Sequence, residues 1–221
     1  LGVTWGGLAT TRIAHDDELL DLAARSGCRA LLVGFESLAP DTLSLTRKRF
    51  NAPKASPEAE YRWVLDKLHA SGIAVMGCFV FGFDTDDPDV FDRTAQFIHE
   101  ANVDLPRFAV LTPFPGTPLY TRLKAEGRLL TEDWTLYDGQ HVVFEPTQMS
   151  PEALLRGTER AWKRTYRWRS IAKRLAGSRT QTALAIATNV GYRYYAHRLH
   201  EYYTCDWNLG LRPASGARPA A

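Results

Sequence analysis

The pattern of hydrophobic and polar positions divides the first 120 residues into short apolar runs that alternate with amphipathic segments. The apolar runs at 30–35, 73–81 and 107–111 lack period-two alternation, which is typical of strands that are covered on both faces. Residues 3–5 form one more candidate strand. Because helical segments separate the runs, the pattern predicts βαβ units and a parallel sheet of about four strands. The functional edge of such a sheet is the carboxyl end of its strands.

Capping residues mark where the predicted helices begin and end. Asp16 and Asp17 begin a helix that Gly27 ends, and further helices begin at Pro40, Pro57 and Pro88. After about residue 118 the pattern becomes helical, with two helices expected at 150–175 and 180–203. The last dozen residues are rich in Pro, Ala, Gly and Arg, which is typical of a disordered tail.

Composition and charge narrow the class of protein. The 221 residues are 45% hydrophobic and 24% charged, which is ordinary for a globular chain. No run of apolar residues is long enough to span a membrane. The net charge of +2 hides an asymmetry, because residues 1–150 carry −7 and residues 151–221 carry +9. This change of character predicts a boundary near residue 150.

The cysteines indicate a reducing compartment and no metal site. Cys28, Cys78 and Cys205 are odd in number and widely spaced, so a disulfide framework is not expected. None of them has a spacing that is typical of zinc or iron–sulfur ligands. We therefore expect a cytoplasmic protein with no metal ligands in this chain.

Three predicted strand ends carry unusual residues. The first is Gly34-Phe35-Glu36-Ser37, where the Glu36 carboxylate could accept two hydrogen bonds from a ribose diol. The alternative is that Glu36 caps the next helix together with Ser37, and the spacing alone favours neither.

The second strand end is marked by Gly82, which would let a ligand approach the backbone closely. The acidic residues after it, Asp86 and Asp87, are better interpreted as a solvated loop that caps a helix.

The third strand end is a rigid loop, Thr112-Pro113-Phe114-Pro115-Gly116-Thr117-Pro118. It could present backbone groups and an aromatic face to an adenine-like ring, or it could be only a stiff turn. Two weaker candidates follow. Lys48 could meet a ligand carboxylate or only complement a helix terminus. A polar cluster of Tyr137, Asp138 and His141 could line a substrate pocket.

Together these segments resemble the radical S-adenosylmethionine (SAM) superfamily. The resemblance is strongest to its cobalamin-binding branch, which includes hopanoid C-2 methylase. The resemblance rests on the order and spacing of the matching segments and covers roughly residues 1–175. The segments are 34–37, 47–51, 72–84, 111–120, 133–144 and 149–152.

The resemblance implies a fold and a set of ligands. The fold would be an α/β fold with the last four strands of a partial (β/α)6 barrel at 1–125, a mostly helical extension at 126–207 and a disordered tail at 208–221. In the family, SAM is cleaved at a [4Fe–4S] cluster for radical chemistry, and cobalamin can supply a methyl group. The residues that would bind SAM are Gly34, Glu36, Ser37, Lys48, Gly82, Pro113, Gly116 and Thr117.

This chain also departs from the family. It lacks the C-x-x-x-C-x-x-C loop that holds the cluster, the second-strand motif that contacts the SAM amino group, and the cobalamin domain. We therefore expect a fragment that is inactive alone and whose parent is a methyltransferase or related enzyme acting on a lipid-like substrate. The alternative is a non-catalytic, degenerate barrel that serves as a nucleotide-binding or interaction module.

The basic segment at 151–207 adds one expectation about partners. Nine aromatic residues between Trp162 and Trp207 are interleaved with cations, a mixture that favours the surface of an anionic membrane. The alternative is that the aromatic residues pack on the barrel while the cations are solvated. The mixture is also compatible with nucleic acid but is not a strong signal for it.

Overall fold

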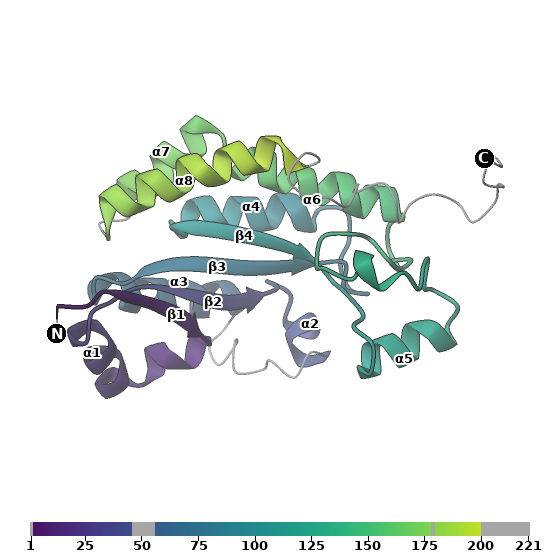
Figure 1. Ribbon diagram of the computed structural model, residues 1–221, viewed down its shortest axis with the longest axis horizontal. Helices are drawn as coiled ribbons and strands as arrows, with labels where there is room; N and C mark the ends of the chain where they lie inside the picture. Colours follow the sequence, from purple (N-terminus) through teal and green to yellow (C-terminus); the bar gives the residue numbers. More distant parts are fainter. Residues whose placement is uncertain (1, 46–55, 178–179, 200–221) are drawn as a thin grey trace.

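The structure, a computed structural model, describes residues 2–45, 56–177 and 180–199. Its centre is a sheet of four parallel strands in the order β1-β2-β3-β4 (Figure 1). The strands are β1 (Trp5–Ala9), β2 (Cys28–Glu36), β3 (Ala74–Phe81) and β4 (Leu105–Val110). The expected parallel sheet is confirmed, although its first strand begins at Trp5, where residues 3–5 were expected to form it.

The helices that connect consecutive strands lie on one face of the sheet (Figure 1), whereas α5 (Pro118–Ala125) follows the last strand. Several helices of the chain begin at a capping residue: the side chains of Asp16, as expected, and of Ser56, Thr117 and Ser150 accept hydrogen bonds from the first-turn backbone. The helices up to residue 125 are η1 (Thr11–His15), α1 (Asp17–Arg25), α2 (Pro40–Leu45), α3 (Pro57–Ala70), α4 (Val90–Glu100) and α5 (Pro118–Ala125).

The main core lies between the sheet and helices α3 and α4. From β2 and β3, alternate residues such as Phe35, Phe79 and Phe81 point into it and are fully buried. Tyr61 of α3 packs on Phe35, with ring centroids 4.5 Å apart, and donates hydrogen bonds to the carbonyl groups of Phe35 and Ser37. Burial of such rings is a main source of stability, at roughly 1.5–3 kcal/mol for a large apolar side chain.

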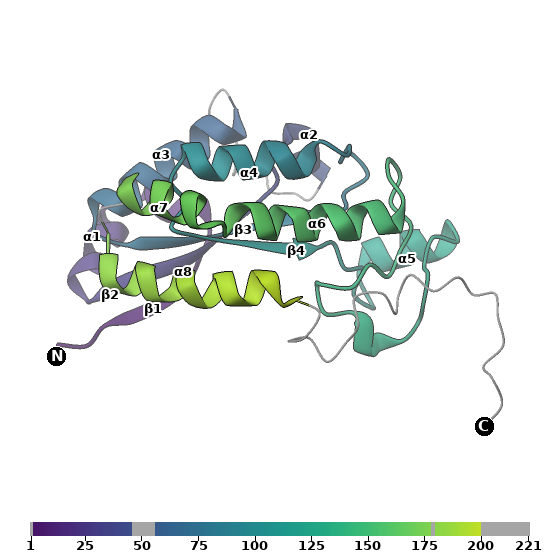
Figure 2. The same ribbon diagram turned by 90° about the horizontal axis from the view of Figure 1, so that it is seen from above.

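Three further helices lie beyond β4. They are α6 (Pro151–Thr165), α7 (Trp168–Gly177) and α8 (Thr182–His197), preceded by the short η3 (Trp134–Leu136) in an irregular segment. Helix α6 packs on α4 and β4, and α8 lies beside the edge of β4 (Figure 2). The fold is thus an α/β fold with four parallel strands and C-terminal helices, as expected. The predicted domain limits at 125 and 207 stay predictions, and the predicted tail at 208–221 lies outside the described residues.

One predicted helix is divided into two. The sequence favours a single helix at 150–175, but the chain turns at Tyr166, whose hydroxyl group donates to the carbonyl of Pro106 at 2.6 Å. The carbonyl groups that the break releases are satisfied from elsewhere. The buried Arg174 donates to the carbonyl of Thr165, and Arg193 donates to the carbonyl of Tyr166. Tertiary contacts therefore override the helical pattern.

Candidate functional site

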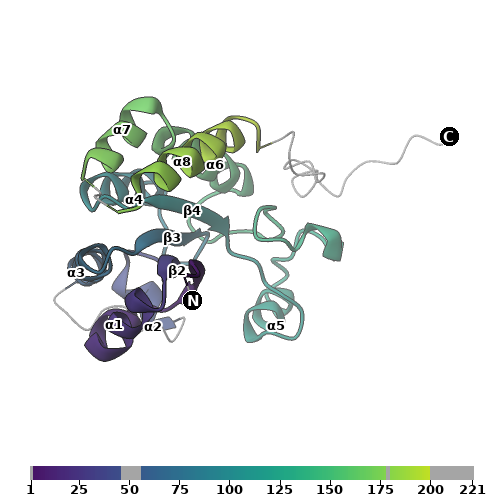
Figure 3. The ribbon, with the colours of Figure 1, turned by 60° about the vertical axis from the view of Figure 1, so that its left-hand side comes forward.

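The second face of the sheet is only partly covered, and it forms the floor of the candidate site. Along β2, β3 and β4, buried residues that face the helices alternate with more exposed residues on the other face. On β1, Leu8 belongs to this open face and is 84% exposed. Figure 3 shows the helices of the core on one side of the sheet and α5 beyond its carboxyl edge. By strand register, the open face is formed mainly by small or apolar residues: Gly6, Leu8, Ala30, Leu32, Gly34, Met76, Cys78, Val80 and Ala109.

Glu36 lies at the carboxyl end of β2 in an unusual backbone conformation. A β-bulge shifts the register between Gly34 and Glu36, and Glu36 has a φ of 69°. A non-glycine residue in the left-handed region is uncommon, and such strain concentrates at functional sites. Its neighbour Ser37 is buried, and its hydroxyl group accepts a hydrogen bond from the backbone of Ala39 at 3.0 Å. Ser37 therefore has a local structural role at the turn into α2.

Gly82 directly follows β3 and has a φ of 106°, a backbone conformation that glycine adopts far more easily than other residues. The space where a Cβ would lie is occupied by protein, because Leu154 Cδ2 and Phe144 Cζ would be 2.9 and 3.2 Å away. The backbone N–H of Gly82 donates to Asp86 at 2.9 Å. Gly82 is thus required for packing at this strand end, and its predicted contact with SAM stays a prediction.

The expectation of a solvated Asp86 is wrong. Its side chain is 2% exposed and accepts hydrogen bonds from the backbone of Gly82 and Phe83. Burial raises the pKa of Asp86 to about 6 even though these N–H groups favour the charged form. Asp87 behaves as expected: it is partly exposed, interacts with Arg93 and accepts a hydrogen bond from Asp89 at the start of α4. Ser37 and Asp86 both line a cavity of about 90 Å³, together with residues at the start of α3 and of α4.

The proline-rich loop follows β4 and leads into α5. Pro113 is buried, whereas Phe114 is 50% exposed and Gly116, with a φ of 79°, has open space beside it. Thr117 caps α5 by accepting from Tyr120 at 3.2 Å and donates to the carbonyl of Phe114 at 2.6 Å. The loop therefore presents an exposed aromatic ring in a fixed turn at the carboxyl edge of the sheet.

The polar cluster of Tyr137, Asp138 and His141 is a compact turn beside the end of β4. Asp138 accepts hydrogen bonds from the backbone and from Nδ1 of His141, both near 3 Å, and His141 is fully buried. Tyr137 is 6% exposed and donates to the carbonyl of Thr131 at 2.7 Å. Partial burial raises the pKa of Tyr137. These side chains support the turn, and their predicted place in a substrate pocket stays a prediction.

No metal site is found among the described residues, in which no group of three His, Cys, Asp or Glu side chains could hold an ion. Cys28 is buried, which raises the pKa of its thiol, and Cys78 lies half-buried on the open face. Two residues that the sequence singled out, Lys48 and Cys205, lie outside the described residues. None of the helices described here is long and apolar enough to cross a bilayer.

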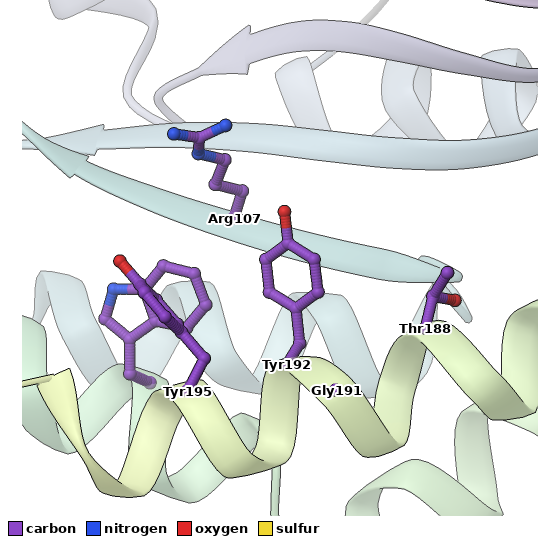
Figure 4. Close-up of a pocket in the computed structure, with 6 residues that line it drawn as sticks. Arg107, Thr188, Gly191, Tyr192 and Tyr195 are labelled. Atoms are coloured by element: carbon purple, nitrogen blue, oxygen red, sulfur yellow. The ribbon is translucent and has the colours of Figure 1, made fainter. Parts of the chain in front are cut away.

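The sequence prediction missed a cavity between β4 and α8. It holds about 360 Å³ and is shown in Figure 4. The signal that could have found it is Arg107, a lone charge at the start of an otherwise apolar predicted strand. The lining residues are Arg107, Trp162, Thr188, Gly191, Tyr192 and Tyr195.

Comparisons with known proteins identify relatives of this chain. It is 37% identical over 177 residues to bacteriochlorophyllide d C-12(1)-methyltransferase of Chlorobaculum tepidum, a match that covers 80% of this chain and 37% of that protein. It is 31% identical over 125 residues to hopanoid C-2 methylase of Rhodopseudomonas palustris, covering 57% of this chain and 23% of that protein. The chain therefore spans well under half the length of these curated relatives.

Two further comparisons concern parts of the chain. Residues 117–215 match a family described as a domain of unknown function (DUF4070). The solved structure of the radical S-adenosylmethionine methyltransferase TsrM from Kitasatospora setae, with cobalamin and a [4Fe–4S] cluster bound, aligns with a TM-score of 0.48 and 20% identity over 68% of this chain and 29% of that chain. The sequence comparisons agree with the resemblance that the motifs suggested: this chain is homologous to part of the bacteriochlorophyllide methyltransferases and of hopanoid C-2 methylase.

Proposed function

We propose that this chain is the SAM-binding portion of a radical SAM methyltransferase. The observation that carries the proposal is Glu36, held at a φ of 69° by a bulge where β2 reaches the carboxyl edge of the sheet. A carboxylate at this position can accept hydrogen bonds from both hydroxyl groups of a ribose. The conformation costs on the order of 1–3 kcal/mol, which favours a functional reason for keeping it.

The surroundings of Glu36 fit the rest of SAM. Gly34 and Cys78 pair in neighbouring strands. Because Gly34 has no side chain and that of Cys78 is small, the open face beside Glu36 is nearly flat, and a nucleoside could lie against the sheet there. The exposed ring of Phe114, in the loop after β4, is suited to stacking on adenine. Gly116 leaves the loop backbone accessible. The predicted contact between Lys48 and the SAM carboxylate remains part of the proposal.

The described residues do not fit an iron–sulfur cluster. They contain two cysteines, which lie in different strands and form no group with other metal-ligating side chains. A cluster needs several thiolates close together, so its ligands and a cobalamin domain would have to come from elsewhere in the whole protein. When bound, the cluster with SAM would supply radical chemistry and cobalamin would supply the methyl group.

The relatives indicate the kind of substrate. Their names specify a bacteriochlorophyllide in one case and a hopanoid in another, both of which are large molecules with fused or joined rings. The open, mostly apolar face of the sheet is suited to a molecule of this kind. The proposed reaction is therefore methylation of a large, apolar, ring-containing or lipid-like substrate.

The test is the affinity of the complete gene product for SAM after Glu36→Gln. The substitution keeps the size and backbone strain of Glu36 but removes its charge, and we expect SAM binding to weaken by about 1–3 kcal/mol, or roughly 5- to 150-fold. Glu18→Gln, an exposed change in the first turn of α1, is the matched control and should leave the affinity unchanged.

Two outcomes would count against the proposal. Equal SAM affinity for wild type and Glu36→Gln, at equal thermal stability, would reduce Glu36 to a structural residue. A complete reading frame without three closely spaced cysteines would favour the nucleotide-binding or interaction module instead.

A further inference from the structure

Arg107 is a charged residue on a face of the sheet that is otherwise small and apolar. It lies in the middle of β4, pairs in register with Cys78 of β3, and has Ala109 as its next neighbour on the same face. Its side chain is exposed. Within the described residues, no hydrogen bond or ion pair engages its guanidinium group. A planar cation with five donors is thus available on the open face.

The cavity beside Arg107 is aromatic and rigid. Trp162 of α6 stacks on Tyr192 of α8, with ring centroids 6.1 Å apart and planes at 13°, and meets the edge of Tyr195 at 5.2 Å. Trp162 also packs against Phe108 of β4, with ring centroids 5.3 Å apart. The hydroxyl group of Tyr195 donates to Gln140 at 3.2 Å, which fixes that ring as well. The rings are therefore positioned before any ligand arrives.

The polar groups at this cavity favour an anion. In Figure 4 the hydroxyl group of Tyr192 on α8 points towards β4, and the Arg107 side chain extends from β4 away from α8, over the neighbouring strand. No hydrogen-bond partner for the Tyr192 hydroxyl is found in the described part of the chain. Among the residues that line the cavity there is no carboxylate, and Arg107 is the charged one. An acidic group entering here would meet a guanidinium and a hydroxyl donor without a competing negative charge.

We propose that Arg107 and Tyr192 bind the carboxylate of a planar, mostly apolar substrate whose ring system packs on the aromatic cluster and the open face of the sheet. This deepens the proposed function, because it assigns the substrate to the same face of the sheet at which Glu36 would hold SAM. The guanidinium fork accommodates the two carboxylate oxygens side by side, and the tyrosine hydroxyl adds one donor. The site would then distinguish an acid from its ester.

The test compares a planar acid with its neutral ester on the 221-residue chain. The probes are 1-pyrenebutyrate and its methyl ester, with binding followed by pyrene fluorescence. We expect Arg107→Gln to weaken binding of the acid about tenfold, the loss typical of a charge-assisted hydrogen bond, and to change binding of the ester less than about twofold. Tyr192→Phe should weaken binding of the acid by a smaller factor, and Arg169→Gln, an exposed change on α7, should alter neither.

The outcomes separate this proposal from the proposed function. If Arg107→Gln weakens acid and ester equally, or leaves the acid unaffected, Arg107 does not recognise a carboxylate and the inference is overturned. The SAM test at Glu36 uses a different ligand and a different residue. A negative result there, with acid selectivity intact at Arg107, would remove the radical SAM reaction and leave the carboxylate site standing.

Discussion

Asp84 joins segments that lie far apart in the sequence. It follows β3, and its carboxylate accepts hydrogen bonds from Arg122 at 2.7 Å, Arg128 at 2.7 Å and Thr147 at 2.6 Å. Its carbonyl group accepts one more from Gln148. One carboxylate therefore fixes α5 and the irregular segment after it to the carboxyl edge of the sheet, next to the candidate site.

The charge on Asp84 should contribute to stability in a defined pH range. Partial burial alone would raise its pKa, but the hydrogen bonds from Thr147, Arg128 and Arg122 lower it from 3.8 to about 2. A lowered pKa means that the stabilisation is complete above 3.8 and is lost as the pH falls towards 2. At neutral pH, Asp84→Ala should lower the free energy of unfolding by about 1–3 kcal/mol, because it removes the hydrogen bonds from Arg122, Arg128 and Thr147 to a charged acceptor.

Denaturant unfolding at several pH values checks this prediction. The difference between wild type and Asp84→Ala should narrow as the pH falls below 3.8. Asp21→Ala is the control, because Asp21 forms only an exposed pair with Arg25 on α1 and should have little effect. A constant difference across this range would show that Asp84 acts through packing and not through its charge.

Single residues also show what sequence reasoning could and could not find. The position of Glu36 at a strand end was predictable, because a carboxylate directly after an apolar run is a local signal, whereas its contact with SAM stays a prediction. The role of Asp84 was not found, because its partners Arg122 and Thr147 are 38 and 63 positions away. Arg107 was missed for a similar reason. Whether a charged strand residue faces the helices or the open side depends on the strand register, which is a tertiary property.

At the scale of elements, one close contact between two helices depends on a glycine. Gly157 of α6 lies against Phe91 of α4, and a Cβ there would be 2.2 Å from the Phe91 ring. Gly191 of α8 is also helical, but nothing lies within 4 Å of its Cβ position. The same substitution in these two helices should therefore have opposite effects.

Gly157→Ala should destabilise the protein by about 1–3 kcal/mol, because overpacking exceeds the gain in helix propensity. Gly191→Ala should stabilise it by up to about 1 kcal/mol, since only the propensity gain remains. Thermal and denaturant unfolding of both variants provides the measurement. If both substitutions stabilise the chain, the close packing of α6 on α4 is not present in solution.

The elements themselves were predictable where their causes are local. Pro57, Pro118 and Pro151 each follow a capping residue, and a helix begins at each of them. The apolar runs form β2, β3 and β4 as predicted. Their lack of alternation predicted strands covered on both faces, but the second face of the sheet is only partly covered. The break at Tyr166 was not predictable, because it depends on hydrogen bonds to Pro106 and from Arg193, which belong to other elements.

At the scale of the whole molecule, the charge asymmetry of the sequence is reflected in where the exposed cations lie. Among the described cations of the basic segment, Arg160, Lys163, Arg169 and Lys173 are exposed on α6 and α7, and Arg167 is exposed between these two helices. Trp162 and Tyr166 are buried against the sheet, as the packing alternative predicted. Other large apolar residues of the segment are about half exposed: Trp168, Leu184, Ile186, Val190 and Tyr194. Helices α6, α7 and α8 lie together on one side of the molecule (Figure 1).

Because of these exposed cations and apolar side chains, we predict that the chain binds anionic bilayers more strongly than neutral ones. Each exposed cation near the bilayer contributes on the order of 1 kcal/mol, less at high salt, while exposed aromatic and aliphatic side chains favour the interface. Sedimentation at low salt with anionic and with neutral liposomes measures the binding.

Arg169→Glu on α7 should weaken binding to anionic liposomes several-fold, whereas Arg12→Glu on η1, an equal change of charge outside the basic segment, should change the binding little. If the two variants behave alike, general charge and not a membrane-facing side governs the binding. If wild type stays in the supernatant with both liposome types, the cations on α6 and α7 are only a solvated surface.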